Sequence, residues 1–197
     1  YVYHGIPSGF KPPLNNTSKQ GVLMLGGDSH QKNPENMLKA WAQLPKELQK
    51  AHPLTILGFV GGEDSIISKT IRALGIENDI VIKGWVTEDE LIQAMQTSKV
   101  FIFASREEGF GFPLVQSMAS GTPVVTSEAD VLIEIGQDAV CSAKAEDFLA
   151  LSSAVRSLLT DEKLYNEKVQ KGLTISSKFT WEHTAEHIAS TYLTLLK

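Results

Sequence analysis

The sequence has one cysteine, Cys141, and no long uninterrupted apolar run. A single thiol cannot form an internal disulfide, so we expect a reducing and therefore cytoplasmic environment. A membrane-spanning helix needs about 18 or more apolar residues in a row, which is more than any run in this sequence offers. The formal net charge is −5, and because a basic footprint is lacking, nucleic acid is not an expected partner.

Recognisable cofactor motifs are also lacking. No His, Asp and Cys residues occur at the spacing of metal ligands, so no metal is expected. No strand-like segment is followed by a G-x-G-x-x-G loop, which disfavours an NAD-binding dehydrogenase. The 197 residues, with an ordinary apolar content of 42%, are enough for one substantial core. The first residue is not methionine, and we expect the chain to be a piece of a longer protein.

Alternating strand-like and helix-like segments make up most of the chain. Apolar runs predict strands at 21–25, 54–58, 80–82, 100–104 and directly after Pro123. Helical periodicity predicts helices at 34–44, 64–74, 148–159, 161–175 and 181–196, with shorter turns after Pro113 and at 131–135. Thr87 and Glu90 form a capping-box pattern for a helix over 88–97, and 126–128 is expected to be a polar loop. This alternation predicts a parallel sheet wound on both faces.

Residues 104–125 combine several features of a ligand-binding turn. An apolar strand leads into a glycine-bearing turn, Pro113 suits a first helical turn, and Gly121 suits the helix exit. The carboxylate of Glu108 and the backbone amides of 110–112 therefore meet at the carboxyl end of a strand. Parallel sheets bind ligands at that edge, and helix N-termini there hold phosphates. An ordinary strand-turn-helix connection explains the spacing alone equally well.

The full string resembles the signature of retaining glycosyltransferases of the GT-B fold, family 4 type. The matching residues are Glu108, Gly109, Phe110, Gly111, Pro113, Met118, Ala119, Gly121, Pro123 and Val124. The resemblance extends over almost all of the chain. It implies the carboxyl-terminal, donor-binding half of that fold: a single Rossmann-like doubly wound sheet with a terminal helix. Residues 1–20 would then be an interdomain hinge or linker, and 21–197 the nucleotide-sugar-binding domain.

The resemblance also implies a reaction. A nucleotide diphosphate sugar would donate its glycosyl group, with retention, to an acceptor hydroxyl held by a missing N-terminal domain, without a cofactor. The implied catalytic residues are Glu108, which would orient the sugar, and Lys32, which would contact the diphosphate. The other donor-binding positions carried over are Gly26, Gly27, Val86, Gly109, Phe110, Gly111, Phe112 and Gln116. The full-length protein could also associate peripherally with a membrane.

Three positions depart from the family pattern. Gln116 stands where a second Glu is expected, and Gly27 and Gln31 stand where many members carry Arg. An amide keeps one acceptor and adds two donors, so weaker donor binding is expected. These departures leave open a competing hypothesis, a glycosyltransferase-like module that binds or scaffolds without catalysis. His4 is interpreted as a hinge residue, and Trp85 as a packing residue in preference to a base-stacking one.

Overall fold

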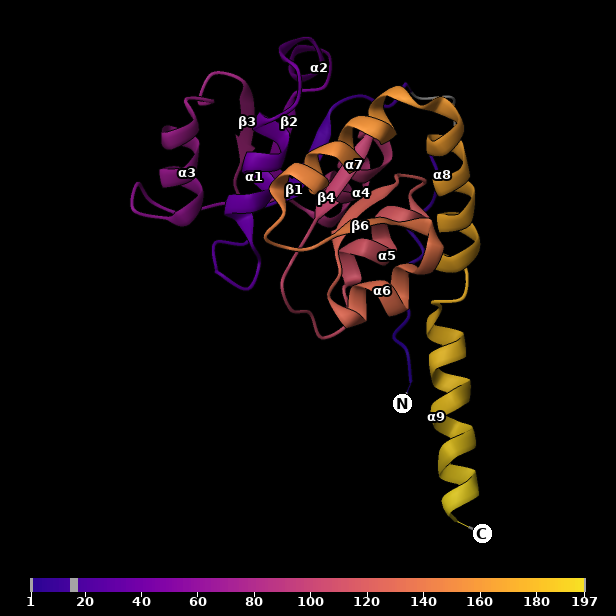
Figure 1. Ribbon diagram of the computed structural model, residues 1–197. Coiled ribbons are helices and arrows are strands. Elements are labelled where there is room, and N and C mark those ends of the chain that lie inside the picture. Colours follow the sequence, from indigo (N-terminus) through magenta and orange to yellow (C-terminus); the bar gives the residue numbers. More distant parts are fainter. Residues whose placement is uncertain (1, 15–17, 197) are drawn as a thin grey trace.

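The computed structural model describes residues 2–14 and 18–196 and shows a six-stranded, wholly parallel sheet between layers of helices (Figure 1). The strand order is β3-β2-β1-β4-β5-β6. The strands are β1 (Val22–Leu25), β2 (Leu54–Leu57), β3 (Ile80–Lys83), β4 (Val100–Phe103), β5 (Val124–Ser127) and β6 (Cys141–Ala143). The predicted Rossmann-like doubly wound fold is confirmed.

Helices connect the strands and continue beyond the last one. They are α1 (Pro34–Ala42), α2 (Lys46–Ala51), α3 (Ile66–Leu74), α4 (Glu88–Thr97), α5 (Phe112–Ala119), α6 (Asp130–Gly136), α7 (Phe148–Thr160), α8 (Glu162–Ser176) and α9 (Trp181–Leu195), with a 3-10 turn at Gln137–Ala139. Figure 1 shows α9 running away from the sheet beside the N-terminal segment. Among the described residues, no helix combines the length and apolarity that crossing a bilayer requires.

The core lies on both faces of the sheet. Alternate residues of β1 separate into two clusters, with Val22 and Met24 packed beneath α1, α3 and α7, and Leu23 packed against α4, α5 and α6. Strands covered on both faces are nearly continuous runs of apolar residues, and all four residues of β4 are apolar and buried. Because the strands have no polar face, the chemistry must lie in the loops at their ends.

The strand order places a topological switch point between β1 and β4. The chain moves from β1 to β2 and β3 on one side, returns to β4 beside β1, and continues outward to β5 and β6. The connection after β1 therefore leads towards β2, and the connection after β4 leads the opposite way, towards β5. The crevice between such loops is where open α/β sheets bind ligands. Residues 26–33 and 104–111 form these two loops.

Local sequence signals predicted some elements correctly and others incorrectly. The capping box of α4 is present: the Thr87 amide donates to Glu90 Oε2 at 2.7 Å, and the Glu90 amide donates to Thr87 Oγ1 at 3.3 Å. The predicted loop at 126–128 is wrong at its first two residues, which belong to β5 and are buried. Their hydroxyls donate to the carbonyls of Phe103 and Ser105, and these hydrogen bonds allow polar residues inside a buried strand.

Candidate functional site

The two residues predicted to be catalytic form an ion pair at the switch point. Lys32 lies in the loop between β1 and α1, and Glu108 lies in the loop between β4 and α5. Lys32 Nζ is 2.8 Å from Glu108 Oε1, and the two side chains are 39% and 9% exposed. The fold thus brings a cation and a carboxylate together from opposite sides of the crevice. The nearly buried carboxylate has fixed orientation, and the lysine remains accessible to a ligand.

Backbone and amide hydrogen bonds join the two loops. The Arg106 amide donates to the Gln31 carbonyl at 2.8 Å, and Gln31 Nε2 donates to the Glu107 carbonyl at 3.2 Å. Asn33 Nδ2 donates to the Ala104 carbonyl at 2.8 Å. Asn33 is fully buried and has a left-handed backbone, with φ 56°, a conformation that Asn tolerates better than most residues. Together these contacts fix the loop that carries Lys32.

The side chain of Arg106 adds to this framework. Its Nε is 3.0 Å from Glu146 Oε1, and its Nη1 donates to the His30 carbonyl at 2.5 Å. Sequence reasoning missed both Arg106 and Asn33 as parts of the site. Asn directly before a helix-starting proline was an available local signal for Asn33. The partners of Arg106 lie 40 and 76 residues away in the chain, so no local pattern indicated them.

Glycines line the side of the crevice formed by the loop after β1. A Cβ atom at Gly26 would lie 2.6 Å from the backbone nitrogen of Phe59, and one at Gly27 would lie 2.6 Å from Lys32 Cγ. Real Cβ atoms do not approach other atoms so closely, so a larger residue at 27 would displace the lysine side chain. The glycine that departs from the family pattern therefore makes room for Lys32.

The loop after β4 presents free amides beside Glu108. Gly111 is the N-cap of α5 and has φ 85°, a left-handed backbone that favours glycine. A Cβ atom there would also lie 2.9 Å from Leu132 Cδ2. Within the described part of the chain, no protein acceptor takes the amide hydrogens of Gly109, Phe110, Gly111 or Phe112. These four donors and the start of α5 can hold an anion.

An apolar hollow of about 320 Å³ opens beside Gly26 and Gly27, at the carboxyl ends of β1, β2 and β3. Leu57, Trp85 and Val86 also line it. Among the described residues, the Val86 amide and carbonyl have no hydrogen-bond partner. The hollow therefore offers an apolar surface, with one backbone donor and one backbone acceptor at its margin, to a flat heterocycle.

Trp85 corrects the sequence-based interpretation. The side chain expected to pack is 84% exposed at the rim of this hollow. It follows β3, the edge strand of the sheet, where Val81 and Ile82 are themselves 46% and 45% exposed. The ring face of Trp85 is therefore available to a ligand.

A second hollow, also of about 320 Å³, lies on the other side of Glu108. Its lining includes Arg106, Glu107, Glu108, Glu128 and Asp130, from the loops after β4 and β5 and the start of α6. Carboxylates are acceptors that suit sugar hydroxyls. In the described ranges, 2–14 and 18–196, no group of three or more His, Cys, Asp and Glu residues could hold a metal ion.

Gln116 lies in the second turn of α5 and is partly exposed. Across the part of the chain that the structure describes, its side-chain amide has no protein partner.

The site thus has one central ion pair, Lys32–Glu108, with an apolar hollow on one side and an acidic hollow on the other. A doubly wound sheet with this arrangement at its switch point belongs to the Rossmann-like class found in the C-terminal domains of GT-B glycosyltransferases.

Comparison with known families gives a more specific identification. Residues 7–175 match the family described as Glycosyl transferases group 1, and the chain belongs to that family. The O-antigen chain mannosyltransferase B of Escherichia coli is 29% identical over 171 residues, which are 87% of this chain and 45% of that protein. The chain therefore spans less than half the length of this curated relative.

Solved structures share the fold. Sucrose-phosphate synthase from Thermosynechococcus elongatus superposes with a TM-score of 0.82 at 21% identity, over 98% of this chain and 51% of that one. Anabaena HepE, solved in complex with UDP and glucose, also has a TM-score of 0.82, at 20% identity over 97% of this chain and 55% of that one. In both cases this chain corresponds to about half of the longer protein.

Proposed function

We propose that this chain is the donor-binding domain, residues 21–197, of a retaining hexosyltransferase that uses a nucleotide diphosphate sugar. Residues 1–20 are the linker to an N-terminal domain that holds the acceptor hydroxyl. The observation that carries the proposal is the Lys32–Glu108 pair, 2.8 Å apart, at the switch point of the sheet. The apolar hollow suits a base and the acidic hollow a sugar, and the ion pair between them suits a diphosphate.

The apolar hollow takes the nucleobase. Its backbone donor and acceptor at Val86 suit a base edge, and the exposed ring of Trp85 provides a stacking surface, which is worth about 1–3 kcal/mol per base in single-strand nucleic acid binding. Gln116, in the second turn of α5, accepts from one ribose hydroxyl and donates to the other. The hollow has no charged side chain, so the phosphates lie nearer Lys32.

The diphosphate lies between Gly26–Gly27 and the start of α5. Negative charge builds up on it as the glycosyl bond breaks, and fixed donors at that position stabilise the transition state. Lys32 supplies a charged donor, and the amides of residues 109–112 supply neutral ones. Glu108 accepts from hydroxyls of the sugar and orients the ring towards the acceptor. This chemistry uses no metal and no cofactor.

The named activity of the E. coli relative, mannosyl transfer, makes GDP-mannose one donor to test, and the UDP bound to HepE makes UDP-glucose another. The competing hypothesis, a binding or scaffold module, rests on Gln116, Gly27 and Gln31. Two of these residues have structural roles that do not depend on a loss of catalysis. Gly27 leaves room for the Lys32 side chain, and Gln31 donates a hydrogen bond to the Glu107 carbonyl.

The experiment is a screen of nucleotide sugars with the full-length protein that contains this chain. Binding is measured by calorimetry, and transfer by release of the nucleoside diphosphate, with NMR of the product to read the anomeric configuration. We expect one donor to bind and to be consumed with retention. Binding without transfer to any acceptor would favour the non-catalytic module, and absence of binding to any donor would overturn the donor-binding function proposed here.

A further inference from the structure

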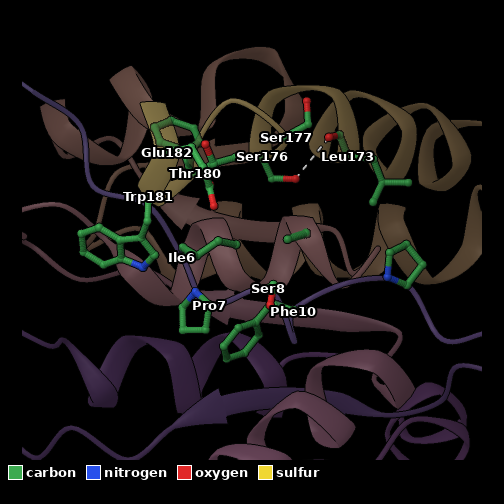
Figure 2. Close-up of a pocket in the computed structure, with 13 residues that line it drawn as sticks. Ile6, Pro7, Ser8, Phe10, Leu173, Ser176, Ser177, Thr180, Trp181 and Glu182 are labelled. Carbon is green, nitrogen blue, oxygen red and sulfur yellow. Dashed lines mark hydrogen bonds between the residues drawn. The ribbon is translucent and has the colours of Figure 1, made fainter. Parts of the chain in front are cut away.

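The N-terminal segment, residues 2–10, is held against the start of α9. A Cβ atom at Gly5 would lie 2.2 Å from the Trp181 backbone nitrogen, so only glycine allows this approach. The Ile6 amide donates to the Phe179 carbonyl at 3.1 Å, and Thr184 Oγ1 donates to the Tyr3 carbonyl at 2.8 Å. Figure 2 shows Ile6 and Pro7 opposite Thr180 and Trp181, around a cavity of about 430 Å³.

The same segment contacts the loop after β4 through aromatic rings. The His4 ring stacks on Phe112, with centroids 5.5 Å apart and planes at 29°, and meets Phe110 edge-on at 5.2 Å and 89°. Tyr3 lies 6.5 Å from Phe110. On the far side, Phe110 packs edge-on against Phe179 at 5.8 Å. Each separation lies within the range of favourable aromatic pairs.

These rings are packed against the part of the loop that carries the free amides. Phe110 and Phe112 flank Gly111, and their amides are two of the four free donors beside Glu108. Gly109 is exposed, with no atom within 4 Å of where its Cβ would lie, and Phe112 is 38% exposed. The contacts of Tyr3 and His4 with these two rings therefore help to fix the direction of the amides.

We propose that His4 is a positioning residue: its ring, stacked on Phe112 and edge-on to Phe110, aligns the amides of residues 109–112 to receive the diphosphate. This inference rests on the proposed function of that loop. His4 itself does not touch the ligand.

The test uses three variants of the full chain. His4→Ala removes the ring, His4→Phe keeps an aromatic ring, and His187→Ala is a matched control on the exposed part of α9. UDP, GDP and inorganic pyrophosphate are titrated while the backbone amides are followed by NMR. Losing one or two aromatic contacts predicts about 3- to 10-fold weaker binding for His4→Ala. His4→Phe and His187→Ala should stay within about twofold of the wild type.

If His4 only stabilised the fold, His4→Ala would not change the loop amides selectively while leaving the Val86 response intact. We expect His4→Ala to shift the amides of residues 109–112 in the free chain and to leave the Val86 response to nucleotide intact. Unchanged pyrophosphate affinity and unchanged loop amides in His4→Ala would overturn the positioning role while leaving the proposed function standing. Failure of the wild type to bind UDP, GDP or pyrophosphate would instead overturn the donor site itself.

Discussion

At the scale of the residue, the Lys32–Glu108 ion pair joins two groups that must bind different parts of the donor in the proposed reaction. Lys32 is to bind the diphosphate and Glu108 the sugar, yet without a ligand each neutralises the other at 2.8 Å. A diphosphate must therefore compete with the carboxylate for the ammonium group. Because the Glu108 side chain is only 9% exposed, the lysine is the member of the pair that can turn towards a ligand.

This competition predicts the behaviour of Glu108→Gln. The variant removes the charge that draws Lys32 away, so affinity for UDP or GDP should stay equal or rise. Turnover in the full-length protein should fall on the order of 100-fold, because the sugar is no longer held in the reactive position. Calorimetry and a transfer assay measure the two effects, with Glu77→Gln, at an exposed turn before β3, as the control. A parallel loss of nucleotide affinity would show that Glu108 contacts the diphosphate.

Lys32→Ala should give the opposite selectivity. A charge-assisted hydrogen bond contributes roughly 1.5–3 kcal/mol, so affinity for UDP or GDP should fall about 10- to 100-fold. Binding of the nucleoside alone should not change, because the base hollow lies beyond the lysine. Lys69→Ala, which removes an exposed lysine of α3 paired with Asp64, is the control in the same calorimetric titrations. An equal loss for the nucleoside would contradict the assigned role.

At the scale of the element, the sequence predicted those parts of the fold that local interactions determine. The bounds of α4 were predicted to the residue because Thr87 and Glu90 cap each other within one turn. The short helix α2 was missed, because its six residues are too few for a periodic pattern. The buried hydroxyls of β5 and the exposure of Trp85 depend on neighbouring strands, and a linear pattern does not contain that information.

The candidate site also has parts that the sequence indicated and parts that only the folded structure reveals. The residues of the loop at 108–112 were found because their order resembles a family signature. The Lys32–Glu108 ion pair, the hydrogen bonds of Arg106 and the stacking of His4 on Phe112 join segments separated by 40 residues or more. Only the folded chain brings these groups together, so their distances could not be predicted from spacing.

Lys19 links two elements from the opposite end of the sheet. Its Nζ donates to the Ser120 carbonyl at the end of α5 and to Thr122 Oγ1, at 3.2 and 2.6 Å. Burial, together with the nearby charge of Lys99, lowers the pKa of Lys19 to about 8. An unfolded lysine has a pKa near 10.4, so between these values the unfolded chain binds more protons and stability rises with pH.

Lys19→Met should abolish that contribution. Between pH 8 and 10, the free energy of unfolding of the wild type should rise by on the order of 1–2 kcal/mol relative to the variant. Urea denaturation at several pH values measures the difference. Comparison with the variant separates Lys19 from Tyr165, whose pKa burial raises to about 12 and which acts in the opposite direction above pH 10. Parallel stability curves for the two proteins would refute the assignment.

At the scale of the whole molecule, every proposed donor contact lies at one edge of one sheet, in the loops after its strands or in the first two turns of α5. Lys32, Val86 and residues 109–112 follow β1, β3 and β4, and the two hollows beside them are open to solvent. A charged contact is weaker in such a setting than in a closed cleft, because water screens it. The E. coli relative is more than twice as long as the matched region, which leaves room for a second wall.

This geometry predicts that the chain alone binds nucleoside diphosphates weakly and transfers no sugar. Transfer needs donor and acceptor held together at near-attack distance, and one sheet edge supplies contacts to the donor only. We expect a dissociation constant on the order of 0.1–10 mM for UDP or GDP. NMR titration should place the shifts at Lys32, Val86 and residues 108–116, and a coupled assay should detect no release of nucleotide above the uncatalysed rate. Robust transfer by residues 1–197 would mean that the acceptor site also lies within this chain.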